Sequence, residues 1–294
     1  KKLGRNRYQF FTEDLHSTAM ARIARETELR HAMTRDELVL FYQPQVNAIT
    51  DYVEGFEALV RWQHPVEGLI GPQEFIELAE ETGMIGTIGE WVLREACRQT
   101  QQWRRQNNRD FHIGVNLSVD QFYTRNMVQM VKAILHETGL PPNKLLLEIT
   151  ESLALENDET HLQVLADLKD LKVQLALDDF GTGNSSLSYL KHFPVDMLKI
   201  DRSFVHGLGQ DIHVEAIARA TIALAESLDL SLVAEGVETQ KQCDWLMAEG
   251  CEVIQGYLYA RPMVADECLL WLQKHEARMN KPVKKNKRKR VAEG

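Results

Sequence analysis

Two adjacent aspartates, Asp178 and Asp179, follow a short apolar run and precede a glycine-rich turn. Neighbouring carboxylates repel each other, so a folded site that holds both needs a cation beside them. The run 174–177 predicts a strand, and acids at a strand end before Gly181 and Gly183 are typical of the edge where a barrel or sheet presents charge to a ligand. Ordinary turn preferences also place Asp next to Gly, so the pair alone does not separate a surface turn from a site.

Polar side chains recur at the ends of the other predicted strands. Turn and capping preferences account for Asp and Asn there, but not for Glu, Lys and Gln, which are costly to bury unless they are paired or bind a metal. In a closed barrel of parallel strands these ends meet at one face, where active sites are built. The side chains expected to converge are Glu57, Arg61, Asn116, Glu148, Glu151, Asp178, Asp179, Lys199, Asp201, Glu235, Glu238 and Gln255.

The composition of this ring indicates chemistry with divalent metals. Several carboxylates and one asparagine form an all-oxygen site suited to Mg²⁺, Mn²⁺ or Ca²⁺. Of Asp178 and Asp179, one can bridge a pair of ions and the other can bind one ion of the pair. Two ions about 3.5–4 Å apart can activate water and stabilise phosphoryl oxygens during in-line displacement. Lys199 could orient or polarise the attacking water, and Arg61 could bind a phosphate oxygen.

The cysteines and histidines argue against other metal sites. The four cysteines have no C-x-x-C pair, which predicts reduced thiols rather than a disulfide framework or a cysteine-zinc site. The ten histidines are dispersed, without an H-E-x-x-H spacing.

The charge of the chain is unevenly distributed. The net charge is −9, although residues 281–294 hold seven Lys or Arg and one Glu. The acidic remainder of the chain is a poor binder of nucleic acid, and an anionic substrate would need metal ions or local arginines. We interpret the basic stretch as a disordered, solubilising tail rather than a nucleic-acid or lipid patch.

The elements that must position the ring alternate along the chain. Short, nearly all apolar runs alternate with helical patterns over some 240 residues, which indicates parallel βαβ units with strands buried on both faces. The turn signal NAITD between the first two runs predicts a hairpin-like start. The predicted strands are 38–46, 53–62, 111–116, 144–149, 173–178, 196–200, 230–235 and 251–255.

The number of strands favours a closed (β/α)₈ barrel over an open doubly wound sheet. No G-x-G-x-x-G motif opens a helix after a strand, so a dinucleotide site is unsupported. No apolar run approaches the roughly 18 residues of a membrane span, and no signal-peptide pattern opens the chain. The missing initial Met predicts a fragment of a longer protein. The predicted helices are 14–32, 72–82, 87–106, 126–138, 159–170, 185–191, 211–228, 239–249 and 265–277.

The polar strand ends also carry a family resemblance. The sequence resembles the EAL-domain cyclic-di-GMP phosphodiesterases over about residues 35–273. Seven motifs occur in order and in register, which makes the resemblance highly specific. The motifs are EALVRW at 57–62, NLS at 116–118, EITE at 148–151, DDFGTG at 178–183, KID at 199–201, EGVE at 235–238 and QGY at 255–257.

The resemblance implies an α/β fold, a (β/α)₈ TIM-like barrel with an antiparallel first strand. It implies hydrolysis of one phosphodiester of cyclic-di-GMP to linear pGpG, with two divalent cations, Mg²⁺ or Mn²⁺, as cofactors. The implied ligands are Glu57, Asn116, Glu148 and Asp178 for one ion, and Asp178, Asp179 and Glu235 for the second.

The resemblance also implies roles beyond metal binding. Lys199 would hold the nucleophilic water, and Gln255 would support the waters at the metals. Glu151 would fix the loop after Asp179, and Glu235 is also assigned to the catalytic set. The residues implied to bind the substrate are Gln43, Leu59, Arg61, Asp201, Glu238, Tyr257 and Pro262.

The start of the chain resembles the end of a GGDEF (diguanylate cyclase-like) domain. We therefore expect a linker helix and domain remnant at 1–34, the EAL barrel at 35–277 and the basic tail at 278–294. The parent protein would carry GGDEF or sensory domains upstream and act in the cytoplasm, with a possible membrane anchor. A homodimer is expected, although Asn184 stands where the family usually has Tyr, in a loop that couples the dimer to the metal site.

Two alternatives remain open at this point. A receptor would bind cyclic-di-GMP without cutting it, but such members usually lack a metal ligand, and none is missing here. An unrelated Mg²⁺-dependent barrel enzyme would use Lys199 as a base on a carboxylate substrate and ignore phosphodiesters. Binding of cyclic-di-GMP and formation of product from it together separate the three functions.

Overall fold

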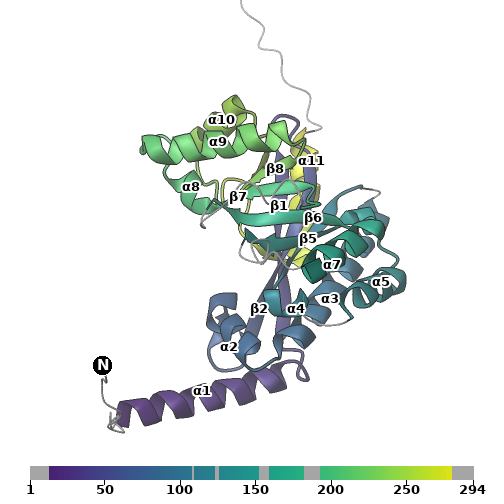
Figure 1. The fold of residues 1–294 in the computed structure, drawn as a ribbon, viewed down its shortest axis with the longest axis vertical. Helices are drawn as coiled ribbons and strands as arrows, with labels where there is room; N and C mark the ends of the chain where they lie inside the picture. Colours follow the sequence, from purple (N-terminus) through teal and green to yellow (C-terminus); the bar gives the residue numbers. More distant parts are fainter. Residues whose placement is uncertain (1–12, 108, 123–125, 152–158, 182–192, 280–294) are drawn as a thin grey trace, which may run out of the picture.

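The computed structural model describes residues 13–107, 109–122, 126–151, 159–181 and 193–279. Its strands form one sheet that closes into an eight-stranded barrel, with helices on the outside (Figure 1). The strands of the barrel are β1 (Leu38–Asn47), β2 (Val53–His64), β4 (His112–Leu117), β5 (Leu145–Thr150), β6 (Gln174–Phe180), β7 (Met197–Ile200), β8 (Ser231–Ala234) and β9 (Val253–Gln255).

The first strand closes the barrel in the reverse direction. β1 pairs antiparallel with β2 on one side and with β9 on the other, whereas neighbouring strands from β2 round to β9 are parallel. The predicted barrel with an antiparallel first strand is therefore confirmed. Two short strands that the sequence did not predict, β3 (Gly68–Ile70) and β10 (Met263–Val264), pair with β2 and β1.

The helices follow the predicted order with shifted ends. The predicted helix at 185–191 lies outside the described residues. In Figure 1, α3, α5 and α7 lie on one side of the barrel and α9 and α10 on another. The helices are α1 (Glu13–Ala32), α2 (Ile76–Glu81), α3 (Ile85–Asn107), α4 (Val119–Phe122), α5 (Met127–Thr138), α7 (Glu159–Asp170), α8 (Arg202–His206), α9 (Ile212–Ser227), α10 (Gln240–Glu249) and α11 (Ala265–Met279).

The prediction of one helix over 72–82 is wrong in detail. The segment starts as a 3₁₀ turn over Pro72–Glu74, and Phe75, with φ −138°, separates this turn from α2. Phe75 is fully buried and packs edge-on against Trp62. The burial of one aromatic ring thus overrides the helical periodicity of the segment.

A small apolar cluster fills one end of the barrel interior. It consists of side chains from five consecutive parallel strands, and it is separate from the larger core between the sheet and the helices. We call it the apolar layer; its members are Leu146, Ala176, Met197, Val233 and Val253.

The first helix, α1, extends along the edge of the molecule beside α2 (Figure 1). Its last two turns bury Leu29 and Ala32 completely. The Arg25 guanidinium binds the Glu67 carboxylate at 2.8 Å and lies 5.5 Å from the centre of the Trp62 ring. The end of α1 therefore packs on β2 as part of the barrel domain. Among the described residues, no helix has the length and apolar character needed to cross a membrane.

Candidate active site

Each member of the apolar layer lies two positions before a polar residue of the predicted ring on the same strand. Because side chains alternate between the two faces of a strand, both residues face the barrel interior at successive levels. The polar residue is always nearer the carboxyl end of its strand. The residues placed in this way are Glu148 on β5, Asp178 on β6, Lys199 on β7, Glu235 directly after β8 and Gln255 on β9.

The remaining strands complete this level of the barrel. On β2, Glu57 lies opposite Gln43 of the reversed strand β1. On β4, Asn116 lies opposite Glu148 of β5. The predicted side chains from separate parts of the chain therefore converge at one end of the barrel.

The Lys199 ammonium group lies at the centre of the ring. Its Nζ is 2.5 Å from Glu235 and 2.6 Å from Glu148. Its distances to Asp178 and Glu57 are 3.3 and 3.7 Å. The side chain is 0% exposed, so four carboxylates from four strands compensate one fully desolvated charge.

The negative charge of the ring exceeds what one lysine can balance. Burial raises the pKa of Glu148 well above its usual value, although Lys199 acts in the opposite direction. Burial likewise raises the pKa of Glu235 to about 8 and, together with repulsion from Asp178, that of Asp179 to about 6. Divalent cations beside these carboxyl groups would favour their ionised forms and offset their mutual repulsion.

Two observations show that the ring fits a divalent metal. The Oε1 atom of Glu148 is buried and has no hydrogen-bond partner, although a buried carboxylate oxygen normally has one. Gly114 provides the space for it, because a Cβ there would overlap Oε1. The donors at this level are carboxylate and carboxamide oxygens, which suit Mg²⁺ or Mn²⁺.

The carboxylates of the ring lie around the Lys199 ammonium group and do not form a close group among themselves. In the described part of the chain, one group of three His, Cys, Asp or Glu residues has ligand atoms all within 4.8 Å, and it lies elsewhere, where β2 meets α1. That group is Glu28, His64 and Glu67. His64 Nδ1 accepts a hydrogen bond from the backbone N–H of Glu67 at 3.0 Å, so this nitrogen is already used and the group is better explained as packing between the two elements.

Glu57 is held from both sides by amide groups. Asn116 Nδ2 donates to its Oε1 at 2.7 Å, and Gln255 Nε2 donates to its Oε2. Gln255 also lies 3.4 Å from the Oε1 atom of Gln43, whose own Nε2 donates to the carbonyl of Ala260. These hydrogen bonds fix the orientation of one predicted metal ligand.

Two residues at the carboxyl end of β6 and directly after it have a left-handed backbone. Asp179 has φ 55° and Gly181 has φ 92°. Asp179 N–H donates to Asp178 Oδ1 at 3.0 Å, and Gly181 N–H donates to Glu151 Oε2 at the same distance. Glu151 thus contacts the backbone just beyond the two aspartates. The following residues, including Asn184, lie outside the described part of the chain.

The predicted substrate-binding residues are more dispersed. Arg61 is half-buried, which lowers the pKa of its guanidinium, and it donates to the carbonyl of Val60 at 2.8 Å. Tyr257 is 47% exposed, with Arg261 4.1 Å from its ring centre. Leu59 and Pro262 are partly buried.

Two of these residues make contacts with α8. Asp201 accepts a hydrogen bond from Ser203 N–H at 2.9 Å and so caps α8. The exposed carboxylate of Glu238 lies 3.7 Å from His206 Nε2, at the end of α8. Their substrate-binding roles therefore stay predictions.

Sequence reasoning missed two polar residues below the ring, Gln45 and His112. Gln45 is completely buried and donates to Gln255 at 2.8 Å, and its own Oε1 lies 2.8 Å from His112 Nε2. Strand alternation could have found both, since Gln45 is two residues from Gln43 and His112 is four from Asn116.

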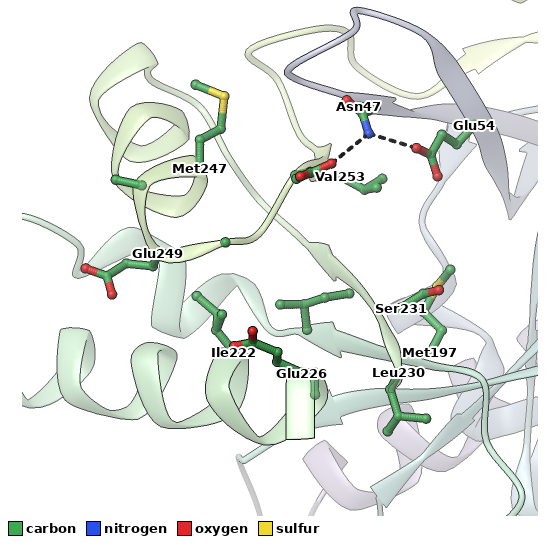
Figure 2. A pocket seen from close by; sticks show the side chains of 15 residues that line it. Asn47, Glu54, Met197, Ile222, Glu226, Leu230, Ser231, Met247, Glu249 and Val253 are labelled. Atoms are coloured by element: carbon green, nitrogen blue, oxygen red, sulfur yellow. Dashed lines mark hydrogen bonds between the residues drawn. The ribbon is translucent and has the colours of Figure 1, made fainter. Parts of the chain in front are cut away.

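A hollow of about 550 Å³ lies at the opposite end of the barrel from the ring. Figure 2 shows Met197, Ser231 and Val253, which begin β7, β8 and β9, along its wall. Asn47 Nδ2 donates to Glu54 and Glu252 at its edge, at 3.0 and 3.3 Å. The hollow is lined by strand starts, so it is not the mouth at which the ring residues meet.

Comparisons with a protein family, with related proteins and with a solved structure agree with this geometry. The EAL domain family matches residues 26–262. The bifunctional diguanylate cyclase/cyclic di-GMP phosphodiesterase MucR of Pseudomonas aeruginosa is 45% identical over 269 residues, which cover 92% of this chain and 39% of MucR. The cyclic di-GMP phosphodiesterase NbdA of the same organism is 42% identical over 263 residues, 90% of this chain and 34% of NbdA.

A solved structure provides the third comparison. The PaMucR phosphodiesterase in complex with c-di-GMP superposes with a TM-score of 0.81 at 46% identity, covering 83% of this chain and 99% of that one. The chain thus spans less than half the length of the curated relatives, but nearly all of the solved domain. The barrel, the ring of carboxylates around Lys199 and these matches lead to one conclusion: the chain belongs to the EAL domain family.

Proposed function

We propose that this chain hydrolyses one phosphodiester bond of cyclic-di-GMP and releases linear pGpG. The observation that carries the proposal is the Lys199 ammonium group, which is buried among carboxylates from four strands. A group of carboxylates around one buried positive charge can accommodate divalent ions and a bridging phosphate. The names of MucR and NbdA and the c-di-GMP complex of the PaMucR domain support this choice of substrate.

We infer that two divalent cations, Mg²⁺ or Mn²⁺, occupy the ring during turnover. When bound, they would supply positive charge that activates water and stabilises the phosphoryl oxygens. The buried, unpartnered Glu148 Oε1 supports this inference. The residues that would hold them are Glu57, Asn116, Glu148, Asp178, Asp179 and Glu235.

Lys199 would hold the attacking water at its Nζ atom. Burial lowers the pKa of Lys199, but Asp178, Glu148, Glu235 and Glu57 outweigh burial and raise that pKa well above its usual value. The side chain therefore acts as a charged hydrogen-bond donor rather than as a base. This disfavours the carbon-acid enzyme, in which a neutral Lys199 would have to abstract a proton.

Residues at the rim would bind the dinucleotide. Arg61 is positioned to bind a phosphate oxygen, because its guanidinium is only half-buried. The exposed ring of Tyr257 is available for stacking on a guanine base. Gln43 and Gln255 lie at the level of the ring beside Glu57, where they would bind or orient waters.

Separation of the products by chromatography tests the function. The purified chain is incubated with cyclic-di-GMP and Mn²⁺, and we expect conversion to linear pGpG that stops when EDTA is added. Binding of cyclic-di-GMP without any pGpG would instead identify a receptor. A chain that neither binds nor cleaves the dinucleotide would contradict both functions and leave the carbon-acid enzyme as the alternative.

We further propose the setting in which the domain works. MucR carries both a cyclase and a phosphodiesterase activity in its name, which supports a GGDEF domain before α1 in the parent protein. The four free cysteines support a reducing, cytoplasmic location. A homodimer is the proposed assembly, and analytical ultracentrifugation of the chain tests it.

A further inference from the structure

A chain of hydrogen bonds runs through the barrel below the ring and ends on Glu57. His112 Nε2 lies 2.8 Å from Gln45 Oε1. Gln45 Nε2 donates to Gln255 Oε1 at 2.8 Å, and Gln255 Nε2 donates to Glu57 Oε2. The four side chains come from β4, β1, β9 and β2, which meet inside the barrel. We call this chain the amide relay.

The carboxylate at its end fixes the direction of every bond in the relay. An ionised carboxylate only accepts, so Gln255 must present its NH₂ group to Glu57 and its oxygen to Gln45. Gln45 must then present its NH₂ group to Gln255 and its oxygen to His112. His112 must therefore donate from Nε2, which selects the neutral Nε2–H tautomer.

The surroundings of His112 favour a closely packed, neutral ring. Its imidazole occupies the space over Gly55, where a Cβ would overlap the ring. Gly55 lies directly opposite Gln45 in the β1–β2 pairing and opposite His112 in the β2–β4 pairing. Burial lowers the pKa of His112 to about 4, so the ring is neutral at neutral pH.

We propose that Gln45 and His112 are positioning residues that hold the Gln255 amide and, through it, the Glu57 carboxylate in the orientation required for metal binding. Neither touches the reacting atoms, and the inference rests on the proposed ligand role of Glu57. Outer hydrogen-bond partners of this kind fix the orientation of ligands, and their loss typically weakens metal binding about 10–100-fold.

Calorimetric titration of the chain with Mn²⁺ tests the relay. Gln45→Met has a similar volume but neither donates nor accepts, so we expect it to weaken Mn²⁺ binding about 10–100-fold. The matched control is Gln99→Met, which makes the same change at a buried glutamine on α3 outside the relay. Gln99→Met should bind Mn²⁺ like the native chain, and equal affinities of the two variants would overturn the proposal.

His112 offers a second pair of variants. His112→Gln keeps an N–H donor, so it should retain most of the Mn²⁺ affinity, whereas His112→Met should resemble Gln45→Met. Equal losses in both would mean that the imidazole acts by packing alone, which contradicts the relay.

The native chain provides a test that needs no variant. Long-range ¹H–¹⁵N spectra of the imidazole ring should show the proton of His112 on Nε2, and this signal should shift as Mg²⁺ is added, in step with metal binding. A proton on Nδ1, or a signal that saturating Mg²⁺ leaves unchanged, would overturn the relay even if the variants fail to fold.

The outcomes separate this inference from the proposed function. A native chain that binds no divalent metal and cleaves no cyclic-di-GMP would refute the function. A native chain that binds Mn²⁺ and releases pGpG, beside a Gln45→Met variant that does both equally well, would refute the relay alone.

Discussion

The Lys199 ammonium group is fully buried, and its charge is stable there only because carboxylates surround it. Removing one partner of a buried ion pair typically costs about 3–5 kcal/mol, since the other charge is left uncompensated. The same side chain is positioned to act on the attacking water. Its stabilising role and its proposed catalytic role can be separated only by measurements that report on each.

Substitution of Lys199 by Ala should lower kcat by orders of magnitude and leave the affinity for cyclic-di-GMP mostly intact. The lost interaction acts at the transition state rather than in the bound substrate. Steady-state kinetics and a separate binding titration with Ca²⁺ in place of Mn²⁺ measure the two effects. Unchanged turnover in a folded variant would contradict the role assigned to Lys199.

Substitution of Glu57 or Asp178 by Ala should remove metal binding and activity together. Both carboxylates contact the Lys199 ammonium group and are predicted ligands. Glu54→Ala is the matched control, because Glu54 is on the same strand as Glu57 but lines the hollow at the other end of the barrel. Calorimetry with Mn²⁺ should show no binding for the first two variants and native binding for the control.

Substitution of Gly114 by Ala should displace the Glu148 carboxylate, because the added Cβ would overlap its Oε1. We expect at least a tenfold loss of Mn²⁺ affinity and about 1–3 kcal/mol of destabilisation from overpacking. Gly86→Ala on α3 meets nothing within 4 Å and serves as the control. Native Mn²⁺ affinity in Gly114→Ala would show that Glu148 does not need this space.

At the scale of elements, the alternating pattern of the sequence predicted the eight barrel strands and the order of the helices. It did not predict α4, α8, β3 or β10, because segments of two to five residues carry no measurable periodicity. The break at Phe75 was also missed, since it depends on burial against Trp62, a contact that local propensity does not contain.

The last turns of α1 should contribute to the stability of the barrel domain. Leu29 is completely buried, so Leu29→Ala should lower the free energy of unfolding by about 2–5 kcal/mol. Ile23→Ala on the same helix should change it by less than about 0.5 kcal/mol, since Ile23 is 58% exposed. Urea unfolding measures both variants, and equal effects would mean that α1 is not packed in solution as described.

At the scale of the molecule, the barrel interior has a polar end and an apolar end. The apolar layer resembles any packed core, whereas the ring concentrates negative charge around one lysine. Metal binding should therefore stabilise the whole fold, since the cations bind the native ring and not the unfolded chain.

Each Mn²⁺ ion bound at 100 times its dissociation constant should stabilise the chain by about 2.7 kcal/mol. Thermal unfolding followed by circular dichroism should show a rise in melting temperature that EDTA reverses. The Asp178→Ala variant should show no such rise. A rise of equal size in that variant would place the Mn²⁺ somewhere other than the ring.

Most of the ring could be predicted from the sequence because its members stand at strand ends in recognisable motifs. The amide relay could not, since Gln45 and His112 become neighbours only through the β1–β2 and β2–β4 registers. The occupation of the ring centre by Lys199 also could not be predicted, because it depends on the side-chain geometry of four strands at once. The sequence pattern thus predicts where the site lies, and the strand register determines which residues hold its side chains in place.

The reversed direction of β1 decides where the chain joins the barrel. Leu38, its first residue, pairs with Trp62 near the carboxyl end of β2, so the polypeptide enters at the catalytic rim instead of the base. Only five residues separate α1 from this strand, and four lie between Leu38 and Gln43. Any domain fused ahead of α1 would connect through the 20 residues of this helix and the five that follow it, so a movement of the helix would reach the ring end of the barrel before the opposite end.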